Sequence, residues 1–416
     1  MNADAKRDLL VVGAGPVGLI TAVLGARAGL DVEIVDQEWR IASRSYACVL
    51  HPHSLGLLDR LGLLSRALEL GTRVDAVGFY EGPERKAEVH LGALAEAEHR
   101  YALVLYQDDL EGLIEDTLRD RYGRRVGWGR RLDGLIWNDD SVTAILESLH
   151  HEATGEAATR WTEVVERRLL TTASYIAGAD GPRSRLVHLL GTESESAGEP
   201  MHYGIFEFEP SEGVCVSDEL RVAIDGPTTH VLWPLPGGTC RWSVQSDGTG
   251  GLAGDDIPVP GRPPSLPQAI RKAAPWFGNG VRNVDWATRV EFPKRILHHF
   301  GRGRCWALGD AAHQTAPGGA QGMNLGFREA EEFVEMLRRV IREGAELEVL
   351  HAASRRWRAE WRCLLGLEPS IVPEAGADPW VASHATQLAS CLPASGPEYA
   401  ALLGQLGLRW KGGPQG

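Results

Sequence analysis

Residues 9–36 of the chain read LLVVGAGPVGLITAVLGARAGLDVEIVD. Residues 9–12 are apolar and predict a short buried strand, and a glycine-rich turn over residues 13–18 follows it. Helical apolar spacing over residues 19–28 comes next, and residues 32–36 predict a second strand. A strand–helix–strand unit of this length is typical of a parallel sheet with helices packed against it, so we expect an α/β fold.

The turn carries the spacing G-x-G-x-x-G, with Asp36 at the end of the second strand. Gly13 permits the tight turn, Gly15 lets a pyrophosphate approach the backbone, and Gly18 allows close helix–strand packing. The helix N terminus offers free N–H groups to phosphates, and Asp36 can accept ribose hydroxyls. The pattern predicts a dinucleotide site, with a purely structural glycine turn as the alternative. It does not separate NAD from FAD, and the sequence contains no second fingerprint of this kind.

The composition is that of a globular enzyme-sized chain. It has 416 residues, 43% hydrophobic and 24% charged, and its net charge is −13. Binding to a nucleic-acid backbone needs clustered cations, so we expect no nucleic-acid partner. We expect no membrane association either, because glycines and Arg27 interrupt the apolar stretch at residues 9–30.

Six cysteines are spread over the chain, and none belongs to a C-x-x-C pair. Neither a zinc motif nor a thioredoxin-like redox motif is predicted, and no metal is expected. Widely spaced thiols in a chain of this size suit a reducing compartment. The N terminus has no signal-peptide pattern, so we expect a cytoplasmic protein.

Two further motifs follow predicted strands. Residues 175–184, YIAGADGPRS, end a strand in an Asp-Gly turn. Residues 303–324, GRCWALGDAAHQTAPGGAQGMN, end another strand in Gly-Asp and lead into a helical pattern over residues 321–343. Such a loop can place backbone N–H groups and a helix dipole against an anion.

The remaining segments give a coarser pattern. Residues 54–70 and 108–120 each have the spacing of an amphipathic helix. From about residue 201 to residue 300, short β-like runs rich in aromatic residues alternate with Gly, Pro and Asp turns. The sequence therefore predicts a second, β-rich region between the two later motifs.

With the N-terminal fingerprint, these motifs make the chain resemble the single-component (class A) flavoprotein monooxygenases of the para-hydroxybenzoate hydroxylase fold, over residues 9–365. The resemblance implies a non-covalent FAD and NAD(P)H as a transient co-substrate without its own Rossmann domain. It also implies reaction of O₂ through a C4a-hydroperoxyflavin. The expected reaction is hydroxylation, epoxidation or Baeyer–Villiger insertion on a small aromatic or polycyclic metabolite, with secondary metabolism as one setting.

The resemblance also implies the residues of the FAD site. These are Gly13, Gly15, Pro16, Val17, Gly18, Asp36, Arg44, Gln107, Asp180, Gly309, Asp310, Pro317, Gly319, Gly322, Met323 and Asn324. Arg44 and Gln107 match flavin-contacting residues of the family. Asp310 would accept the ribityl hydroxyls, and the loop at residues 317–324 would edge the isoalloxazine ring. We expect the helix N terminus near Met323 to stabilise negative charge on the reduced flavin.

No catalytic base is assigned from the sequence. The candidates for substrate contact are Tyr46, His53, His202, Arg221 and Trp233. Each of them is more simply explained as a solvent-facing or packing residue. His313, in the third motif, is interpreted as structural.

The family fold implies three regions. The Rossmann-like FAD-binding domain is expected from residues 1–75, 100–195 and 300–345, the mainly antiparallel β-sheet substrate domain from residues 76–99 and 196–299, and a C-terminal helical segment from residues 346–416. We expect a monomer or a homodimer.

Three alternatives remain open. An oxygen-independent flavin reductase or dehydrogenase is one, because Val187 stands three residues after Ser184, where the family usually has Arg. A flavin-dependent halogenase is another, although no lysine lies between Lys6 and Lys86 and residues 233–236 read WPLP rather than the Trp-x-Trp-x-Ile-Pro motif. A flavin-binding protein without turnover is the third.

Overall fold

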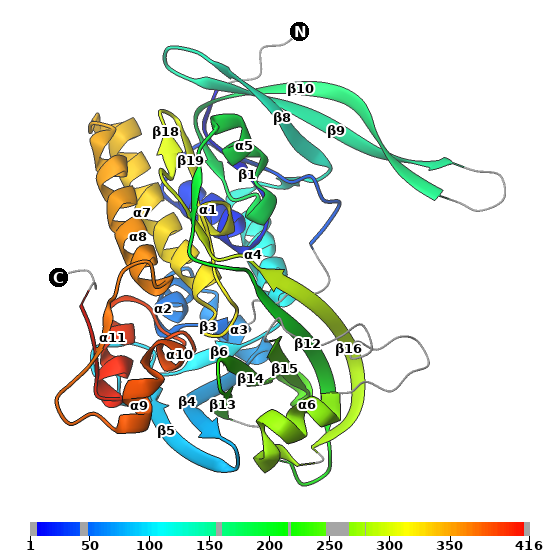
Figure 1. Cartoon of the computed structure of the whole chain (residues 1–416). Coiled ribbons are helices and arrows are strands. Elements are labelled where there is room, and N and C mark those ends of the chain that lie inside the picture. Colours follow the sequence, from blue (N-terminus) through cyan, green and yellow to red (C-terminus); the bar gives the residue numbers. More distant parts are fainter. Residues whose placement is uncertain are drawn as a thin grey trace.

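The computed structural model describes residues 6–41, 49–154, 160–214, 218–246, 266–278 and 280–411. Within these residues the chain forms two large β-sheets with helices packed against them (Figure 1). Arg44 and Tyr46, which the sequence suggested for flavin and substrate contact, lie outside the described residues.

The first sheet contains the parallel strands expected from the glycine motif. Its strands lie in the order β18–β19–β10–β1–β2–β7, with β9 and β8 continuing from β10. The bounds are β1 Arg7–Val12, β2 Val32–Val35, β7 Val126–Gly127, β8 Arg130–Trp137, β9 Val142–Thr154, β10 Arg160–Gly178, β18 Gly301–Arg302 and β19 Cys305–Ala307. β1 pairs in parallel with β2 and β10, and β10 pairs in parallel with β19. Parallel strands end at the same edge of a sheet, so the three sequence motifs lie together there.

Antiparallel strands extend the first sheet in a way that the sequence did not reveal. β8, β9 and the first part of β10 project beyond the body of the protein (Figure 1). The strand predicted before the Asp-Gly turn is therefore only the end of a much longer β10.

The second sheet is mainly antiparallel, as expected. Its order is β16–β12–β15–β14–β13–β4–β6–β3, with β5 paired to β4, and only the β13–β4 pair among these described strands is parallel. The bounds are β3 Val49–Leu50, β4 Thr72–Glu81, β5 Glu84–His90, β6 Ala102–Val104, β12 Met201–Pro210, β13 Asp218–Asp225, β14 Thr228–Pro234, β15 Cys240–Ser246 and β16 Val281–Phe292. The sheet thus combines the β-rich region with strands from the first hundred residues.

The helices agree with the apolar spacing, with one correction. They are α1 Pro16–Arg27, α2 Pro52–Arg60, α3 Leu64–Leu70, α4 Gln107–Tyr122, α5 Arg185–Leu190, α6 Leu266–Ala273, α7 Gln321–Glu343, α8 Glu348–Leu364, α9 Pro379–Ser383, α10 Ala385–Ala389 and α11 Gly396–Gln405. The prediction of a single helix over residues 54–70 is wrong. Gly62 adopts φ 69°, a left-handed conformation that ends α2, and α3 starts in a new direction.

Short elements complete the chain. They are the 3₁₀ helices η1 Leu91–Ala93, η2 Gly181–Arg183, η3 Pro236–Gly238, η4 Pro275–Phe277 and η5 Gly309–Ala311, and the strands β11 Ser194–Ser196, β17 Arg295–Leu297, β20 His313–Gln314, β21 Ile371–Pro373 and β22 Leu408–Trp410.

Helices cover both faces of each sheet. Side chains of α1, α4, α7 and α8 form one apolar cluster with the first sheet, whose far face is covered by Leu186 and Leu190 of α5. Helices α9 to α11 pack on one face of the second sheet, and α6 with η4 packs on the other. The segment 346–416 therefore contributes to the cores of both sheets. The division into three regions stays a prediction.

No helix among the described residues has both the length and the apolar character needed to cross a membrane.

Candidate active site

A cavity of about 400 Å³ lies where the ends of the first sheet's strands meet the second sheet. Of the predicted FAD-binding residues, those that line it are Gly15, Pro16, Val17, Gln107, Asp310, Pro317, Gly322 and Met323. Of the substrate candidates, Trp233 lines it. The other described FAD candidates, Gly13, Gly18, Asp36, Asp180, Gly309, Gly319 and Asn324, are not among the lining residues.

The three glycines of the first motif have different surroundings. A Cβ on Gly13, whose φ is 104°, would lie 2.3 Å from the Ala179 carbonyl oxygen, and one on Gly18 would lie 1.9 Å from the Gly13 oxygen. A Cβ on Gly15 would meet no atom within 4 Å. Gly13 and Gly18 are thus required for packing, whereas Gly15 leaves open space beside the start of α1.

Asp36 supports the glycine turn in this structure. Its Oδ2 accepts a hydrogen bond from the Ala14 N–H at 2.6 Å, and its Oδ1 accepts one from the Glu38 N–H at 2.7 Å. The Asp36 carboxylate therefore holds the glycine turn against the end of β2. Ribose recognition by Asp36 stays a prediction.

Two helix N termini meet at the cavity. Gly15 precedes α1, and Ala320, in a left-handed conformation (φ 52°), precedes α7; neither helix has a side-chain cap. Val17 of α1 and Met323 of α7 line the cavity. The first amide groups of a helix lack intrahelical acceptors, so both ends present N–H donors and positive partial charge to an anion.

Asp310 lies in η5, directly after β19, and its side chain is exposed to the cavity. Surrounding protein raises the pKa of this carboxyl group by desolvation; His313 opposes the shift and Glu329 adds to it. A Cβ on Gly322 would lie 3.1 Å from Asp310 Oδ1, so the carboxyl group lies against the start of α7. It is placed to accept hydrogen bonds from hydroxyl groups in the cavity.

Asn324 joins α7 to the segment before α2. Its Oδ1 accepts hydrogen bonds from the His51 N–H at 2.8 Å and the Ser54 hydroxyl at 2.7 Å. Its Nδ2 donates to the carbonyls of Val49 and Ala320. The side-chain amide of Asn324 is therefore fully used by protein partners.

His51, which the sequence did not single out, holds the loop after β20. Its Nε2 lies 2.8 Å from the Gly319 carbonyl oxygen, so Nε2 carries the proton and donates it. Complete burial lowers the pKa of His51 to about 3, which keeps the ring neutral. Its partner is distant in sequence, so no local pattern could have revealed this role.

Gln107 is oriented by a buried acid on its own helix. Its Nε2 donates to Glu111 Oε1 at 2.7 Å, one turn along α4. Burial raises the pKa of Glu111 to about 7, with the hydrogen bond from Gln107 acting in the opposite direction. Glu111 was not among the sequence candidates.

Asp180 caps α5 from outside the cavity. Its carboxylate accepts hydrogen bonds from the Ser184 hydroxyl at 2.6 Å and the Arg185 N–H at 2.7 Å, and Ser184 accepts from the Val187 N–H. Burial raises the pKa of Asp180. The Asp-Gly motif thus shapes the turn whose residues Gly181 and Pro182 line the cavity.

The second sheet supplies an apolar wall. Trp233 of β14, Val49 of β3 and residues 290–293 at the end of β16 line the cavity here. Trp233 is held by its indole N–H, which donates to the Ser243 hydroxyl at 3.2 Å. This wall faces the helix N termini across the cavity.

The other described substrate candidates do not line the cavity. His53 lies 3.6 Å from Glu331 in an ion-pair contact, and Arg221 donates to Glu219 at 2.8 Å. His202 lies on β12 opposite Glu291 of β16, next to the cavity wall. The sequence could not rank these residues, because the direction of each side chain depends on the register of the second sheet.

The cavity fits a flavin dinucleotide on several counts. Its two uncapped helix N termini suit phosphate and anionic ring atoms, and the open space at Gly15 suits a pyrophosphate. Two buried acceptor atoms at its edge, Oε1 of Gln314 and Oε1 of Gln321, have no hydrogen-bond partner among the described residues. Unpaired buried acceptors indicate a missing donor, which a flavin N–H or hydroxyl can supply.

The fold and the site together define a flavoprotein. The chain matches the family described as FAD binding domain over residues 6–363, and it belongs to that family.

Two curated relatives are named as monooxygenases. Pentachlorophenol 4-monooxygenase of Sphingobium chlorophenolicum is 25% identical over 345 residues, covering 79% of this chain and 57% of the relative. Rifampicin monooxygenase of Streptomyces venezuelae is 30% identical over 332 residues, covering 78% of this chain and 62% of the relative. The chain thus spans only about three fifths of the length of these relatives.

Solved structures share the fold. The p-nitrophenol 4-monooxygenase PnpA from Pseudomonas putida superposes with a TM-score of 0.73 at 23% identity, covering 95% of this chain and 93% of that one. The flavin-dependent monooxygenase PieE, in complex with FAD and substrate, gives a TM-score of 0.70 at 19% identity, covering 87% and 63%. The resemblance to class A flavoprotein monooxygenases, expected from three motifs, is confirmed.

Proposed function

We propose that the protein is an FAD-dependent monooxygenase that uses NAD(P)H and O₂ to oxygenate a small aromatic or polycyclic metabolite. The observation that carries the proposal is the cavity itself, in which two helix N termini and Asp310 face an apolar wall with Trp233 and Phe292. One side suits a flavin and the other suits an aromatic ring. Relatives named as monooxygenases of pentachlorophenol and rifampicin support the same reaction class.

The chain's own residues would bind and orient the cofactor. The chemistry supplied by bound FAD is hydride acceptance from NAD(P)H and the activation of O₂. The α1 N terminus at Gly15 would hold the pyrophosphate, and the N terminus of α7 at Met323 would stabilise negative charge on the ring. Asp310 would accept ribityl hydroxyls, and Gln107 would contact the flavin. The wall from β14 and β16 would keep water from the reacting atoms.

The charges of the cavity narrow the substrate class. Among its described lining residues the charged ones are Asp310 and Glu291, both carboxylates. Glu291, next to Val290 and Phe292 on β16, borders the cavity and is exposed to solvent, and no ion pair of its side chain occurs in the described part of the chain. A lone carboxylate repels an anionic ligand and attracts a cation. We therefore propose a substrate that is uncharged or carries a protonated amine, rather than one with a carboxylate.

Three ring-matched phenols test both proposals: tyramine, 4-ethylphenol and 4-hydroxyphenylacetate. The FAD-loaded protein is assayed for ligand binding through the flavin absorbance, and for NAD(P)H oxidation with O₂ uptake. We expect tyramine to bind about tenfold more tightly than the anionic phenol, a difference of about 1.4 kcal/mol. Glu291→Gln should remove most of that ratio. Asp285→Asn, an exposed acid on the same strand, should preserve it.

The outcomes separate the alternatives. Stimulated NAD(P)H oxidation without oxygen incorporation into the phenol supports a reductase, and a chlorinated product in the presence of chloride supports a halogenase. Protein that holds FAD but oxidises no NAD(P)H with any phenol contradicts the monooxygenase. Equal binding of all three phenols contradicts the charge preference only.

We also propose a cytoplasmic location and a monomeric or homodimeric state. Cys240, Cys305, Cys363 and Cys391 are buried free thiols, which supports a reducing environment. Size-exclusion chromatography with light scattering measures the oligomeric state.

A further inference from the structure

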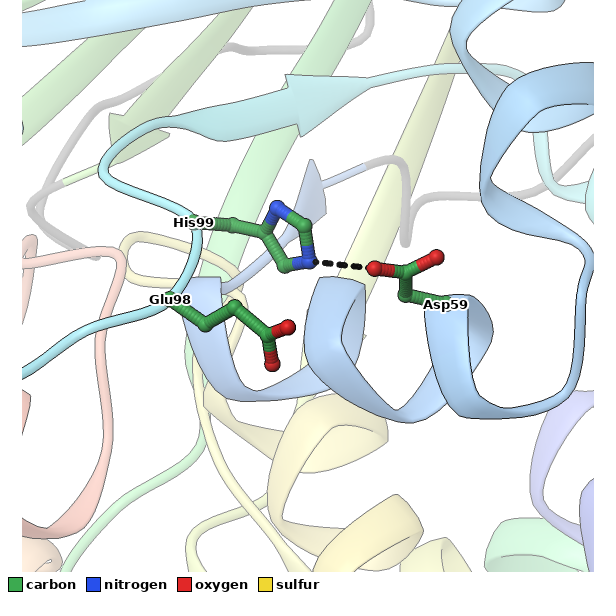
Figure 2. Close-up of side chains that lie close together, drawn as sticks. All are labelled: Asp59, Glu98 and His99. Atoms are coloured by element: carbon green, nitrogen blue, oxygen red, sulfur yellow. Dashed lines mark ion pairs between the residues drawn. The ribbon is translucent and has the colours of Figure 1, made fainter.

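A group of potential metal ligands lies outside the cavity, at the end of α2. Asp59 belongs to the last turn of α2, and Glu98 and His99 lie in the loop between η1 and β6 (Figure 2). One oxygen of each carboxylate and one ring nitrogen of His99 all lie within 4.8 Å of one another. We propose that these three side chains bind a divalent transition-metal ion, with Zn²⁺ as the natural candidate.

The separation of the first two ligands already suits a metal. His99 Nε2 lies 3.3 Å from Asp59 Oδ2. Zinc binds imidazole nitrogen and carboxylate oxygen at about 2.0–2.2 Å, so neighbouring ligands of a tetrahedral site are roughly 3.4 Å apart. Only Glu98, whose side chain is exposed, has to move closer to complete three protein ligands. A water molecule would occupy the fourth position, as in open zinc sites.

The burial and orientation of His99 support its role as a metal ligand. Its side chain is only 14% exposed, and its buried Nε2 meets Asp59 Oδ2 in an ion-pair contact but forms no hydrogen bond among the described residues. The edge of the imidazole packs against Tyr101, with ring centroids 6.0 Å apart, and this contact holds the ring in place. An imidazole nitrogen that faces a carboxylate oxygen at this distance (Figure 2) can share a metal ion with that carboxylate.

The local charges favour a cation. Two carboxylates supply a charge of −2, which a divalent ion neutralises. Arg60 lies on the same helix, but its guanidinium donates to Glu331 at 2.6 Å and forms no ion pair with Glu98 in the described part of the chain. Nitrogen and carboxylate ligands in this ratio suit Zn²⁺ and Co²⁺ better than Mg²⁺ or Ca²⁺, which prefer oxygen alone.

An ion here would connect two segments that lie next in the chain to cavity-lining residues, Val49 and Gln107. Asp59 lies on the helix that follows His51, and His99 precedes β6, which leads directly to Gln107. A metal bond between them would hold the end of α2 against this loop. The proposed site is therefore structural, because its ion lies outside the cavity.

The test uses the full chain, stripped with EDTA and dialysed. Wild-type protein is titrated with Co²⁺ while its visible absorbance is followed, and with Zn²⁺ in a calorimeter and in thermal melts. The variants are His99→Ala and Asp59→Asn. The matched control is His90→Ala, because His90 Nε2 also lies 3.3 Å from a carboxylate, that of Glu88, but has no third ligand within reach among the described residues.

We expect wild-type protein to bind one equivalent of metal, to show the intense absorbance of tetrahedral Co²⁺, and to melt at a higher temperature with Zn²⁺. His99→Ala and Asp59→Asn should each weaken binding roughly tenfold or more, and His90→Ala should bind like wild type. Absence of saturable binding at millimolar Zn²⁺ would overturn the proposal. Unchanged affinity in both ligand variants, with each variant still folded by circular dichroism, would assign the bound metal to other histidines and overturn it equally.

Discussion

His313 and Glu329 form a buried pair behind the cavity, in which the imidazole Nε2 lies 2.8 Å from Glu329 Oε1. The other carboxylate oxygen accepts the Gly309 N–H at 3.2 Å. Trp361 stacks on the imidazole, with ring centroids 3.9 Å apart, and donates its indole N–H to Glu329 at 2.9 Å. The Glu329 side chain of α7 thus fixes the turn that carries Asp310. The interpretation of His313 as structural agrees with this geometry.

Replacing Glu329 should loosen that turn. We expect Glu329→Gln to lower the free energy of unfolding by about 2–4 kcal/mol, because it leaves a buried network with mismatched donors. FAD binding should weaken as well, since Asp310 loses its support. Urea denaturation and flavin fluorescence titration measure the two effects. Glu335→Gln, an exposed position on the same helix, is the control, and equal stability of the two variants would contradict the prediction.

Alanine substitutions at Gly15 and Gly18 should separate the effect on FAD binding from the effect on stability. A methyl group on Gly15 meets open space, so Gly15→Ala should keep the stability of the cofactor-free protein within about 1 kcal/mol. It should weaken FAD binding more than about tenfold, because the methyl group occupies the place of the pyrophosphate. Gly18→Ala should destabilise the protein by about 2 kcal/mol or more through overpacking against the Gly13 oxygen. Thermal melts without FAD and equilibrium titrations with FAD measure the difference. A Gly15→Ala variant with normal FAD affinity would place the pyrophosphate elsewhere.

Glu111 should make the protein less stable as the pH rises. The pKa of Glu111 is about 7 in the folded state and 4.5 in the unfolded state, so between these values the folded state binds more protons. Stability therefore falls from about pH 4.5 to pH 7, by roughly 2–3 kcal/mol. Glu111→Gln should remove this decline and be the more stable protein at pH 8. Denaturation curves at pH 5.5 and pH 8 test it, with Asp116→Asn on the exposed face of α4 as the control.

His51 should have the opposite effect on acid stability. The pKa of His51 falls from 6.5 to about 3 on folding, so below pH 6.5 the unfolded state binds the additional proton. Stability is then lost as the pH decreases, by about 2 kcal/mol at pH 5. His51→Gln keeps a donor for the Gly319 carbonyl and should flatten this loss. His90→Gln, on the exposed surface of β5, should retain the wild-type slope between pH 7 and pH 5.

A charged substitution at Met323 tests whether the positive N terminus of α7 stabilises the reduced flavin. Met323→Glu should lower the flavin reduction potential, because a carboxylate beside this N terminus opposes its positive end. An interaction of about 1–2 kcal/mol corresponds to roughly 20–45 mV for a two-electron couple. Met323→Gln has nearly the same shape without the charge and should stay close to wild type. A potential that is unchanged or raised in Met323→Glu, measured by dye equilibration, would contradict the proposed role of α7.

Much of the fold could be predicted from local sequence. Gly13, Gly15 and Gly18 have separate mechanical functions that their spacing already implies, and the apolar period of residues 321–343 fixes both ends of α7. The antiparallel extension at β8 and β9 could not be predicted in this way. Its strands are half exposed, and their pairing with β10 joins residues far apart in the chain.

The candidate site, like the fold, could be predicted from the sequence only where it depends on neighbouring residues. Strand-end turns and helix starts are set by residues next to each other in the chain, so the sequence alone determined that a glycine turn and helix starts follow the strands of the first sheet at one edge. That these glycines bind a nucleotide stays a prediction. Whether a polar side chain faces the cavity or packs against the protein depends on partners in other elements of the chain, some of them hundreds of positions away. Only the tertiary structure therefore committed Asn324 to protein contacts, gave His51 and Glu329 supporting roles, and brought Glu291 to the border of the cavity.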